Sequence, residues 1–585
     1  MSMTTATFGS LPGAAPRDDR EEKDGARRRL PLIDSYLKEQ QTLTAVTRFS
    51  QLHERDALPA QARYYESLLP LDKPKPGQQY AFSVDLDRCT GCKACVTACH
   101  SLNGLDEAET WRSVGLLHGG SATSPMQQTV TTACHHCIEP GCLAGCPVNA
   151  YEKDPQTGIV RHLDDQCIGC QYCTLTCPYD VPQFNKKLGI VRKCDMCSDR
   201  LAVGEAPACV QACPNEAIAI RIVDKAQIIE DVQADAFLPG APSPGITLPT
   251  TEYKTKRVFP KNTLPADFYN VRPAHNHFPL VVLLVLTQLS VGAFSVDYVV
   301  TSFFHSEETI QRYHALVALA LGLIALGAST THLGRPQYGF RAIMGIGHSW
   351  MSREIAGFGA FAMLAVAYAA GVWANSLLAM LGLPQLDAGW VNASLRWLGA
   401  AVALSGLIGV GCSVMLYAVT RRAFWKLSQS GPRFFSTTAV LGTSITLLVF
   451  TAAARAGEPV PGYIAAGLNG ALIAFSVFKL LHELSIFSHL RLSQASDLKR
   501  TARLMRGELA PLAQLRFLLG ILGGVALPFW LSVFIEPKAS ALALGTLPVV
   551  ITAVGAACLT AGEFIERSLF FMAAASPKMP GAVGQ

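Results

Sequence analysis

Cysteine is the residue whose spacing in this chain points most directly to a particular chemistry. Sixteen of the 18 cysteines lie between Cys89 and Cys213, in four groups of four. The groups are Cys89-x2-Cys92-x2-Cys95-x3-Cys99, Cys134-x2-Cys137-x4-Cys142-x3-Cys146-Pro147, Cys167-x2-Cys170-x2-Cys173-x3-Cys177-Pro178 and Cys194-x2-Cys197-x11-Cys209-x3-Cys213-Pro214. Such close spacing lets one loop bind three corners of a cubane, while the fourth cysteine binds the other cluster of a pair. The sequence therefore predicts four 4Fe–4S clusters.

Two other uses of these cysteines fit less well. Zinc sites consist of two separated Cys-x2-Cys pairs, whereas three of the groups place four cysteines in one short run. A secreted disulfide domain has a similar cysteine count, but the N-terminal residues contain no apolar core of a secretory signal. Arg27-Arg28-Arg29 is followed too soon by polar residues to be a twin-arginine signal. We therefore expect this domain to stay in the cytoplasm, with His135 and His136 forming hydrogen bonds near a cluster rather than ligating iron.

The second half of the chain has the composition of a membrane domain. The whole chain is 50% hydrophobic and 16% charged, and long apolar runs begin beyond His275. A transmembrane helix needs about 20 mainly apolar residues. Eight segments meet this requirement, near 278–302, 313–332, 354–380, 395–418, 434–454, 463–486, 516–535 and 539–562.

The connections between these segments alternate in charge. Basic residues follow the second, fourth and sixth segments, and they are Arg335, Arg341, Arg353, Arg421, Arg422, Lys426, Arg433, Arg491, Lys499, Arg500, Arg503 and Arg506. The opposite connections hold little beyond Arg312, Arg455 and Lys538. Positively charged connections face the cytoplasm. The pattern predicts a multi-pass protein of the cytoplasmic membrane with both termini inside, and a soluble helical bundle would not produce it.

These features predict an α+β double ferredoxin-like iron–sulfur module followed by an all-α transmembrane bundle of about eight helices. The expected divisions are an N-terminal extension at 1–78, partly disordered and partly helical, and a four-cluster domain at 79–235. A stiff, Pro-rich linker at 236–275 and a membrane anchor domain at 276–585 follow.

The cysteine domain resembles a known family. The stretch Tyr80–Ile222, with CTGCKACVTACHSLNG and CIGCQYCTLTCPYDVPQFN, is similar to the iron–sulfur subunit of dimethyl sulfoxide reductase-type molybdoenzymes at all sixteen cysteine positions. The second half resembles the anchor subunit of the same complexes. The motifs that carry this resemblance are His332-Leu333-Gly334-Arg335-Pro336, Ser349-Trp350-Met351-Ser352-Arg353-Glu354 and Glu566-Arg567. Two subunits that are usually separate are then fused in one polypeptide.

The resemblance implies how the cysteine groups pair, which spacing alone leaves open. The first group pairs with the fourth and the second with the third. The implied ligand sets are Cys89, Cys92, Cys95 and Cys213; Cys194, Cys197, Cys209 and Cys99; Cys134, Cys137, Cys142 and Cys177; and Cys167, Cys170, Cys173 and Cys146.

The resemblance also implies a quinone site at His332 and Glu354, beside Gly334, Arg335 and Arg353. Oxidation of a quinol releases two protons, and histidine and carboxylate side chains can accept them. Menaquinol or ubiquinone is the expected redox partner. The plainer alternative is that His332 caps a helix and that Glu354 pairs with Arg353 or Arg335.

Other polar residues of the helices carry weaker predictions. Lys479 and Glu483, four residues apart, are expected to snorkel and form a local ion pair. Asp297 has no obvious partner, and Cys412 and Cys558 are expected to serve only in packing. No haem is predicted, because paired axial histidines facing each other across helices are lacking.

The combined expectation is an electron-transfer and membrane-anchor subunit for a cytoplasmic molybdopterin catalytic subunit, with no substrate chemistry of its own and no nucleic acid partner. The family implies reduction of dimethyl sulfoxide or related S- or N-oxides in anaerobic respiration. The reverse direction, quinone-linked sulfite oxidation, is an alternative, because SLNGLDEAETWRSVG is similar to cytoplasmic sulfite dehydrogenase partners. An ion pump would need charged residues at mid-membrane, and a redox sensor would need an output domain.

Overall fold

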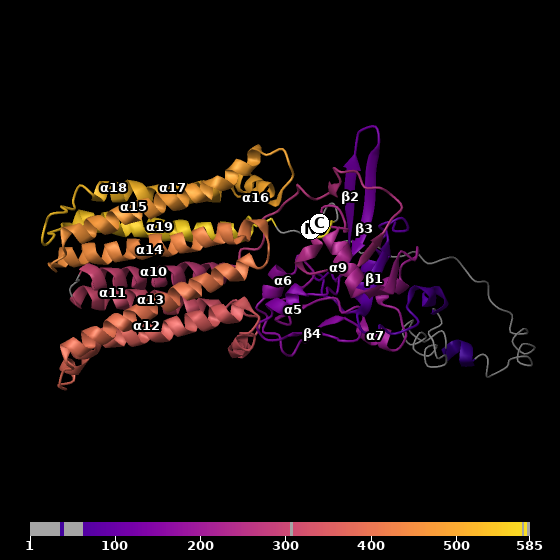
Figure 1. The fold of residues 1–585 in the computed structure, drawn as a ribbon, viewed down its shortest axis with the longest axis horizontal. Coiled ribbons are helices and arrows are strands. Elements are labelled where there is room, and N and C mark those ends of the chain that lie inside the picture. The colour runs from indigo at the N-terminus through magenta and orange to yellow at the C-terminus, as the bar shows by residue number, and fades with distance from the viewer. Residues whose placement is uncertain (1–34, 40–61, 305–307, 576–577, 582–585) are drawn as a thin grey trace, which may run out of the picture.

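The computed structural model describes residues 35–39, 62–304, 308–575 and 578–581. It shows a mixed α/β domain at one end of a long bundle of helices (Figure 1). Most of the N-terminal extension predicted at 1–78 lies outside the described residues, including the part expected to be disordered. Two 3₁₀ turns, Ala62–Tyr64 and Glu66–Leu68, precede the first strand.

The iron–sulfur domain is built on two small three-stranded sheets and two hairpins. One sheet has the order β8-β1-β9, in which β1 runs antiparallel to β8 from Gln78 opposite Asp224 to Val84 opposite Ile218. The other has the order β10-β2-β3. The strands are β1 (Gln78–Asp85), β2 (Ser113–Gly120), β3 (Pro125–Thr132), β4 (Tyr151–Lys153), β5 (Val160–His162), β6 (Gln183–Asn185), β7 (Ile190–Arg192), β8 (Ile218–Asp224), β9 (Glu252–Lys254) and β10 (Leu264–Pro265).

Short helices lie in or near the cysteine groups, and four of them pack in two pairs. They are α4 (Ala94–Leu102), α5 (Gly141–Gly145), α6 (Tyr172–Thr176), α7 (Ser198–Ala202), α8 (Ala208–Gln211) and α9 (Lys225–Gln233). Lys93 and Gln171, each directly after a cysteine, adopt left-handed backbone conformations that turn the loop into α4 and α6. Helix α4 packs on α8, and α5 packs on α6. The fold therefore joins the first cysteine group to the fourth and the second to the third.

The segment predicted as a stiff, Pro-rich linker pairs with strands of the iron–sulfur domain. Strand β9 pairs with β1 in parallel, and β10 pairs with β2. Pro265 lies in β10, a two-residue strand at the edge of its sheet, where a missing N–H is tolerated. Composition indicated extended backbone correctly, but it carried no information on the sheet edges that the segment would cover.

Among the described residues, eight helices are long and apolar enough to cross a membrane, which confirms the predicted number. They are α10 (Phe278–Phe304), α11 (Glu308–Thr330), α12 (Trp350–Met380), α13 (Ala388–Ala418), α14 (Leu427–Ala456), α15 (Gly462–Leu484), a helix formed by α17 (Ala510–Ile521) and α18 (Leu527–Leu531), and α19 (Thr546–Met572). A π-helical turn at Leu522–Ala526 joins α17 to α18 just before Pro528.

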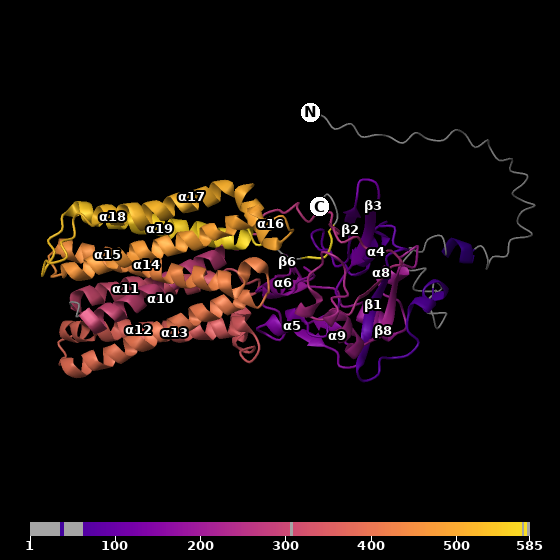
Figure 2. The same ribbon diagram turned by 45° about the horizontal axis from the view of Figure 1, so that its top comes forward.

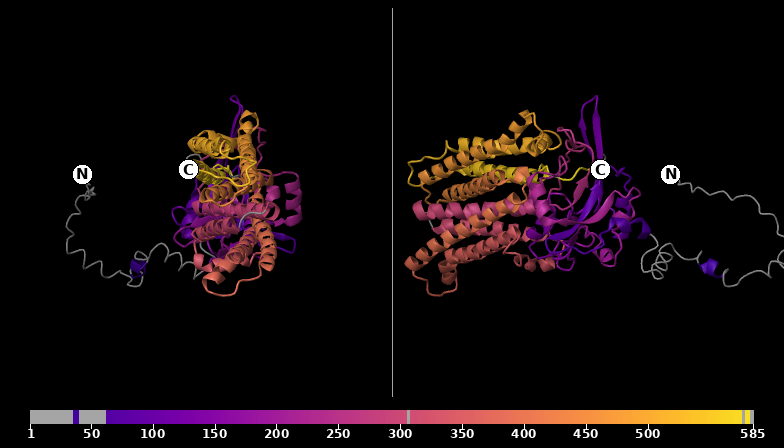
Figure 3. Two further views of the ribbon diagram at one scale, coloured as in Figure 1. Left: turned by 90° about the vertical axis from the view of Figure 1, so that its left-hand side faces the viewer. Right: turned by 45° about the vertical axis from the view of Figure 1, so that its right-hand side comes forward.

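Helices α10 and α14 lie at the centre of the bundle, between the other helices (Figure 1), and Figure 3 shows the same bundle end-on. They approach closely where Gly292 meets Gly442, and a Cβ added at Gly442 would lie 2.3 Å from the carbonyl carbon of Gly292. Helices α11 to α13 pack on one side of this pair, and α15 and α17 to α19 on the other. Small residues allow such contacts in membranes, where there is no hydrophobic drive between helices.

Several helix boundaries differ from the prediction by about two turns or more, among them the start of α13, which lies at Ala388 rather than 395. The last helix covers Thr546–Met572 rather than 539–562, and α14 begins at Leu427 rather than 434. The predicted spans of these last two helices stop next to charged residues, because the one at 434–454 begins just after Arg433 and the one at 539–562 ends just before Glu563. Arg433, Glu563 and Glu566 are instead buried between helices, so they belong to the spans.

The basic connections all contact the iron–sulfur domain. Arg335 donates to the carbonyl of Asp164 (2.9 Å), Arg422 to that of Thr174 (3.3 Å), and Arg500 lies over the Phe268 ring (4.7 Å). These connections include the 3₁₀ segments Pro336–Ile343, Ala423–Trp425 and Ser485–Arg491 and the helix α16 (Asp497–Arg506). Residues 578–581 return to the same domain, where Gly581 accepts from Leu116 of β2 (Figure 2). The described C-terminal residues and the cysteine domain therefore lie on one side of the bundle.

Candidate iron–sulfur and quinone sites

The thiols of the first and fourth cysteine groups lie close enough to affect each other's ionisation. Burial, followed by the charges of Cys209 and Cys197, raises the pKa of Cys99 to about 12. Burial also raises the pKa of Cys89, and the charges of Cys95 and Cys213 add to this rise. Cysteines of the first and fourth groups thus lie together in two clusters of thiols, because α4 packs on α8.

The second and third groups are interleaved in the same way. Burial is again the main cause that raises the pKa of Cys177, to about 12, and Cys134 contributes. At Cys170, burial, Cys146 and Cys167 raise the pKa to about 12. Cys177 therefore lies with the second group, and Cys146 lies with the third.

The environment of these thiols fits iron–sulfur clusters. All 18 cysteines have free thiols, so soft donors are available. Backbone N–H groups point at several sulfurs, including Ala150 N–H to Cys146 Sγ (3.2 Å) and Ala217 N–H to Cys213 Sγ (3.3 Å). Hydrogen bonds to sulfur stabilise the negative charge of a bound cluster. Buried thiols with raised pKa values ionise when they coordinate a metal.

The two adjacent histidines take different positions. His136 accepts a hydrogen bond from Val160 N–H at its Nδ1 (3.0 Å), and the His135 ring packs edge-on against Tyr179 at 4.4 Å. Burial lowers the pKa of His135 to about 3, so this ring is neutral. Only His136 matches the expected hydrogen-bonding role among the contacts of the described residues.

The third cysteine loop docks directly on the membrane domain. Gly334 N–H donates to Gly169 O (3.3 Å), and Arg335 N–H donates to Ile168 O (3.0 Å). On the other side of the loop, the Tyr172 hydroxyl donates to Leu416 O of α13 (2.7 Å). The loop that carries Cys167, Cys170 and Cys173 is therefore held between the segment after α11 and the C-terminal end of α13.

This docking depends on the absence of a side chain at Gly334. A Cβ there would lie 2.1 Å from Gly189 O, a backbone atom that cannot move aside cheaply. We expect Gly334→Ala to push the segment after α11 away from the turn that carries Gly189. Quinol-driven cluster reduction, measured by stopped-flow absorbance, should then slow at least tenfold. Gly327→Ala is the matched control, because a Cβ at Gly327 in α11 meets no atom within 4 Å. Equal rates in the two variants would contradict this account.

His332 lies in the turn after α11, next to the third cysteine loop. Its ring is 5.2 Å from that of His277, which is 5.7 Å from Phe571. Burial and the charge of His275 lower the pKa of His332 to about 4, against an opposing hydrogen bond with Cys170. His332 is therefore neutral near pH 7 and able to accept a hydrogen bond. His277 was not predicted as a site residue, although its position immediately before an apolar run was a usable signal.

Glu354 is buried near the start of α12. Its carboxylate accepts a short hydrogen bond from Ser413 of α13. The two arginines that could have paired with it point elsewhere. Arg353 donates to Ile346 O and Gly347 O, and Arg335 donates to Asp164 O. The alternative in which Glu354 pairs with one of these arginines is thus wrong, and its partner is instead Ser413, 59 residues away in the sequence.

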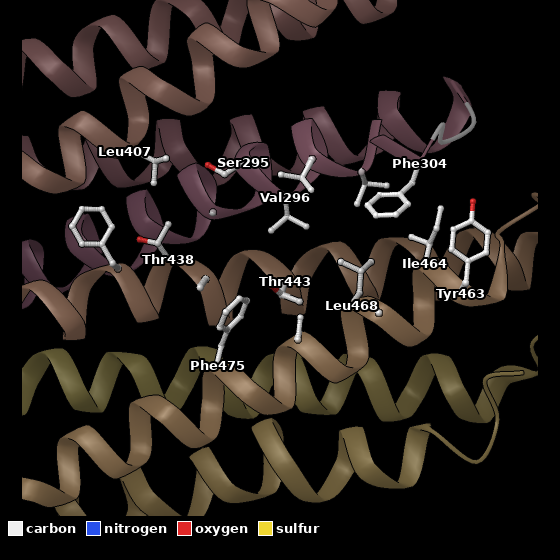
Figure 4. Close-up of a pocket in the computed structure, with 17 residues that line it drawn as sticks. Ser295, Val296, Phe304, Leu407, Thr438, Thr443, Tyr463, Ile464, Leu468 and Phe475 are labelled. Atoms are coloured by element: carbon white, nitrogen blue, oxygen red, sulfur yellow. The ribbon is translucent and has the colours of Figure 1, made fainter. Parts of the chain in front are cut away.

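A large cavity in the membrane domain lies away from these residues. It has a volume of about 510 Å³ between α10, α14 and α15, with Leu407 of α13 at one edge (Figure 4). Apolar side chains such as Val296, Leu468 and Phe475 line it, and none of the five predicted quinone residues does. Its mainly apolar lining suits a hydrocarbon chain better than a polar head group.

A network of buried charges joins α14, α15, α17 and α19 at the ends that lie nearest the iron–sulfur domain. Its members are Arg433, Lys479, Glu483, Arg516, Glu563, Glu566 and Arg567, whose side chains are at most 4% exposed. Arg516 Nη2 lies 2.8 Å from carboxylate oxygens of both Glu483 and Glu563, and Lys479 Nζ lies 3.1 Å from Glu563. The predicted local pair of Lys479 with Glu483 exists at 3.3 Å, but the prediction that these side chains snorkel is wrong.

A second buried polar group lies near the opposite end of the bundle. Asp297 of α10 accepts from the Tyr368 hydroxyl (2.9 Å) and lies 3.6 Å from His314 Nδ1 of α11. His314 Nε2 lies 3.0 Å from Thr446 Oγ1. Asp297, which appeared to have no partner in the sequence, is thus satisfied by two neighbouring helices.

Comparison with known proteins matches both halves of this architecture. A model of the 4Fe-4S dicluster domain matches residues 126–222. A model of the DMSO reductase anchor subunit (DmsC) matches residues 273–572, more than half of the sequence. This chain belongs to the DMSO reductase anchor subunit family. An iron–sulfur domain precedes the anchor domain in the same polypeptide.

The relatives are shorter proteins, each of which matches less than a third of this sequence. The B subunit of anaerobic dimethyl sulfoxide reductase from Escherichia coli (strain K12) is 38% identical over 172 residues, which is 28% of this sequence and 83% of that protein. The corresponding subunit of Haemophilus influenzae is 34% identical over 189 residues, 31% of this sequence and 91% of that protein. The thiosulfate reductase electron transfer subunit PhsB of Salmonella typhi is 37% identical over 153 residues, 26% of this sequence and 79% of that protein. The present polypeptide is an electron-transfer and membrane-anchor protein that binds iron–sulfur clusters.

Proposed function

We propose that this protein passes electrons between the quinone pool and a separate cytoplasmic molybdopterin subunit through four 4Fe–4S clusters. The observation that carries the proposal is the docking of the Cys167–Cys173 loop on the His332–Arg335 motif, through Gly334 N–H to Gly169 O (3.3 Å) and Arg335 N–H to Ile168 O (3.0 Å). An electron acceptor bound to this loop lies directly beside the proposed quinol site. Electrons from a quinol then need not cross the bilayer.

The ligand sets follow nested pairing. Each set combines three cysteines of one group with one cysteine of its partner group. The sets are Cys89, Cys92, Cys95 and Cys213; Cys194, Cys197, Cys209 and Cys99; Cys134, Cys137, Cys142 and Cys177; and Cys167, Cys170, Cys173 and Cys146. The packing of α4 on α8 and of α5 on α6 supports this assignment. When bound, each cluster supplies reversible one-electron chemistry.

His332 and Glu354 form the proton-accepting part of the quinone site. His332, neutral near pH 7, accepts a hydrogen bond from one quinol hydroxyl and takes up its proton as the quinol is oxidised, and the Glu354 carboxylate accepts the proton of the other hydroxyl. The Tyr172 side chain, buried against α13, and the Ser413 hydroxyl hold this end of the site in place. Gly334 and Arg335 position the loop, and Arg353 covers Trp350 at 4.6 Å. Menaquinol and ubiquinol both supply the required hydroxyl groups.

The cytoplasm is the proposed side for the cysteine domain and for both termini. The basic connections that the positive-inside rule assigns to the cytoplasm are the ones that contact the iron–sulfur domain. The charge pattern and the direction of docking therefore support the same orientation. A catalytic subunit bound to the cysteine domain would work in the cytoplasm.

Dimethyl sulfoxide or a related S- or N-oxide is the proposed terminal acceptor, because two of the relatives are subunits of dimethyl sulfoxide reductases. In membranes prepared anaerobically, low-temperature EPR should show cluster reduction by quinol and reoxidation by dimethyl sulfoxide. Reduction by sulfite and reoxidation by quinone would reverse the proposed direction. Purified complex should contain about 16 iron atoms per polypeptide if four 4Fe–4S clusters are bound, and the absence of four-iron signals with dithionite would refute the proposal.

A further inference from the structure

Arg112 is a buried cation without a carboxylate partner among the described residues. Its side chain is 2% exposed, and Nη1 donates to Thr131 Oγ1 (3.3 Å). The guanidinium carbon lies 4.6 Å from the centroid of the Phe82 ring, and Nη2 has no hydrogen-bond partner in the described structure. Burial of an unpaired charge in such surroundings is strongly unfavourable, so a counter-charge is required.

Cysteine sulfurs are the groups that can supply this counter-charge. Thr131 Oγ1, which accepts from Arg112, lies 3.6 Å from Cys95 Sγ. Burial raises the pKa of Cys209, and the nearby positive charge of Arg112 opposes this rise. The guanidinium therefore lies between a cysteine of the first group and one of the fourth group.

Lys193 has an equivalent position further along the domain. It is 3% exposed and forms no ion pair among the described residues. Its Nζ donates to Cys194 O (2.8 Å) and Val160 O, and lies 3.7 Å from Cys134 Sγ. Lys193 thus lies between the second and fourth cysteine groups, which belong to different pairs.

We propose that Arg112 and Lys193 are fixed positive charges that raise the reduction potentials of the clusters next to them. The proposal rests on the four clusters of the proposed function. Each cluster gains one electron from the quinol-derived supply, no bond forms or breaks, and neither cation needs to exchange a proton. A buried positive charge stabilises the more negative, reduced cluster more than the oxidised one, because Coulomb interactions are strong at low dielectric.

The same geometry provides an internal reference. Burial lowers the pKa of Arg112, and the cysteine charges that most oppose this effect are all from the first and fourth groups. They belong to Cys209, Cys95, Cys194 and Cys99. The third group lies at the membrane side, where His162 is already paired with Asp164 at 2.8 Å. Removal of the Arg112 charge should therefore change the two clusters of the first and fourth groups and leave the membrane-side cluster nearly unchanged.

The test is a potentiometric EPR titration of the intact complex in membranes, with Arg112→Met, Arg112→Lys and Lys193→Met compared to the unaltered protein. At a fixed potential, Arg112→Met should lower the reduced-to-oxidised ratio of the adjacent clusters about tenfold, a shift of about 59 mV for one electron. Arg112→Lys should keep most of the original value. Lys193→Met should shift the clusters of the second and fourth groups instead.

Each result separates this inference from the proposed function. Unchanged midpoints in Arg112→Met and Lys193→Met, with full cluster signals under dithionite, would overturn the inference and leave the proposed function intact. Equal shifts in Arg112→Met and Arg112→Lys would also overturn it, because they would reflect lost packing rather than lost charge. Fewer than four cluster signals in the unaltered protein would refute the proposed function itself.

Discussion

Replacing Glu354 by glutamine is expected to slow quinol-driven reduction of the clusters about a hundredfold or more. The amide keeps the volume of the side chain and can still accept the Ser413 hydrogen bond, but it cannot take up the proton that quinol releases. General base catalysis by a positioned carboxylate contributes about 10² to 10⁴ in rate. The measurement is stopped-flow reduction of membranes by a menaquinol analogue, followed through cluster absorbance.

Two controls show whether this loss arises at the quinone site. Dithionite should reduce the clusters of Glu354→Gln as fully as those of the unaltered protein, because the cysteine groups are not changed. Glu508→Gln removes a carboxylate from an exposed position near the same end of the bundle, and its quinol rate should remain normal. A normal rate in Glu354→Gln would remove this residue from the site and leave His332 as the only proton acceptor proposed there.

The parts of the structure that sequence could predict are those set by local patterns. Four cysteines within about ten residues specify one loop that binds a cluster, whichever groups pair in space. An apolar run such as 281–296 specifies a membrane helix, because unsatisfied backbone groups are too costly in lipid. These local rules predicted the iron–sulfur module, the number of helices and the end of the bundle at which the basic connections lie.

The parts that sequence could not predict depend on neighbours far away in the chain. Ser413 is 59 residues from Glu354, so no local pattern links the two. Glu563 and Glu566 appeared to end a span because charged residues usually lie outside the membrane. Their partners, among them Arg433 and Arg516, are on other helices, and pairing makes burial tolerable. A hydropathy profile registers a charged residue but carries no information on its partner in another helix. For this reason the last span is predicted about two turns too early in the sequence.

The same limit applies to the fused architecture. The prolines at 236–275 predicted extended backbone, but the sheet edges that β9 and β10 cover are made by residues more than a hundred positions earlier. Burial of this segment, the basic connections and the returning residues 578–581 fix the cysteine domain on the bundle. Covalent fusion thus comes with an extensive non-covalent interface, which keeps the third cysteine loop against the quinone motif.

Replacing Arg516 by methionine is expected to destabilise the membrane domain by about 3 to 5 kcal/mol, the usual cost of breaking a buried ion pair on one side. Arg516 contacts Glu483 and Glu563 at 2.8 Å, and both carboxylates would keep only Lys479 as a close cation. The measurement is the Tm of the purified complex in detergent, with exposed Arg506→Met as the matched control.

A double variant shows that the loss arises from unbalanced charge. Adding Glu483→Gln to Arg516→Met removes one of the two carboxylates that lost their partner, so part of the lost stability should return. Lost packing of the arginine stem alone predicts no recovery, because the second substitution restores no contact. A Tm of Arg516→Met equal to that of Arg506→Met would show that water or lipid head groups reach this network, and that the four helices are held together by apolar packing instead.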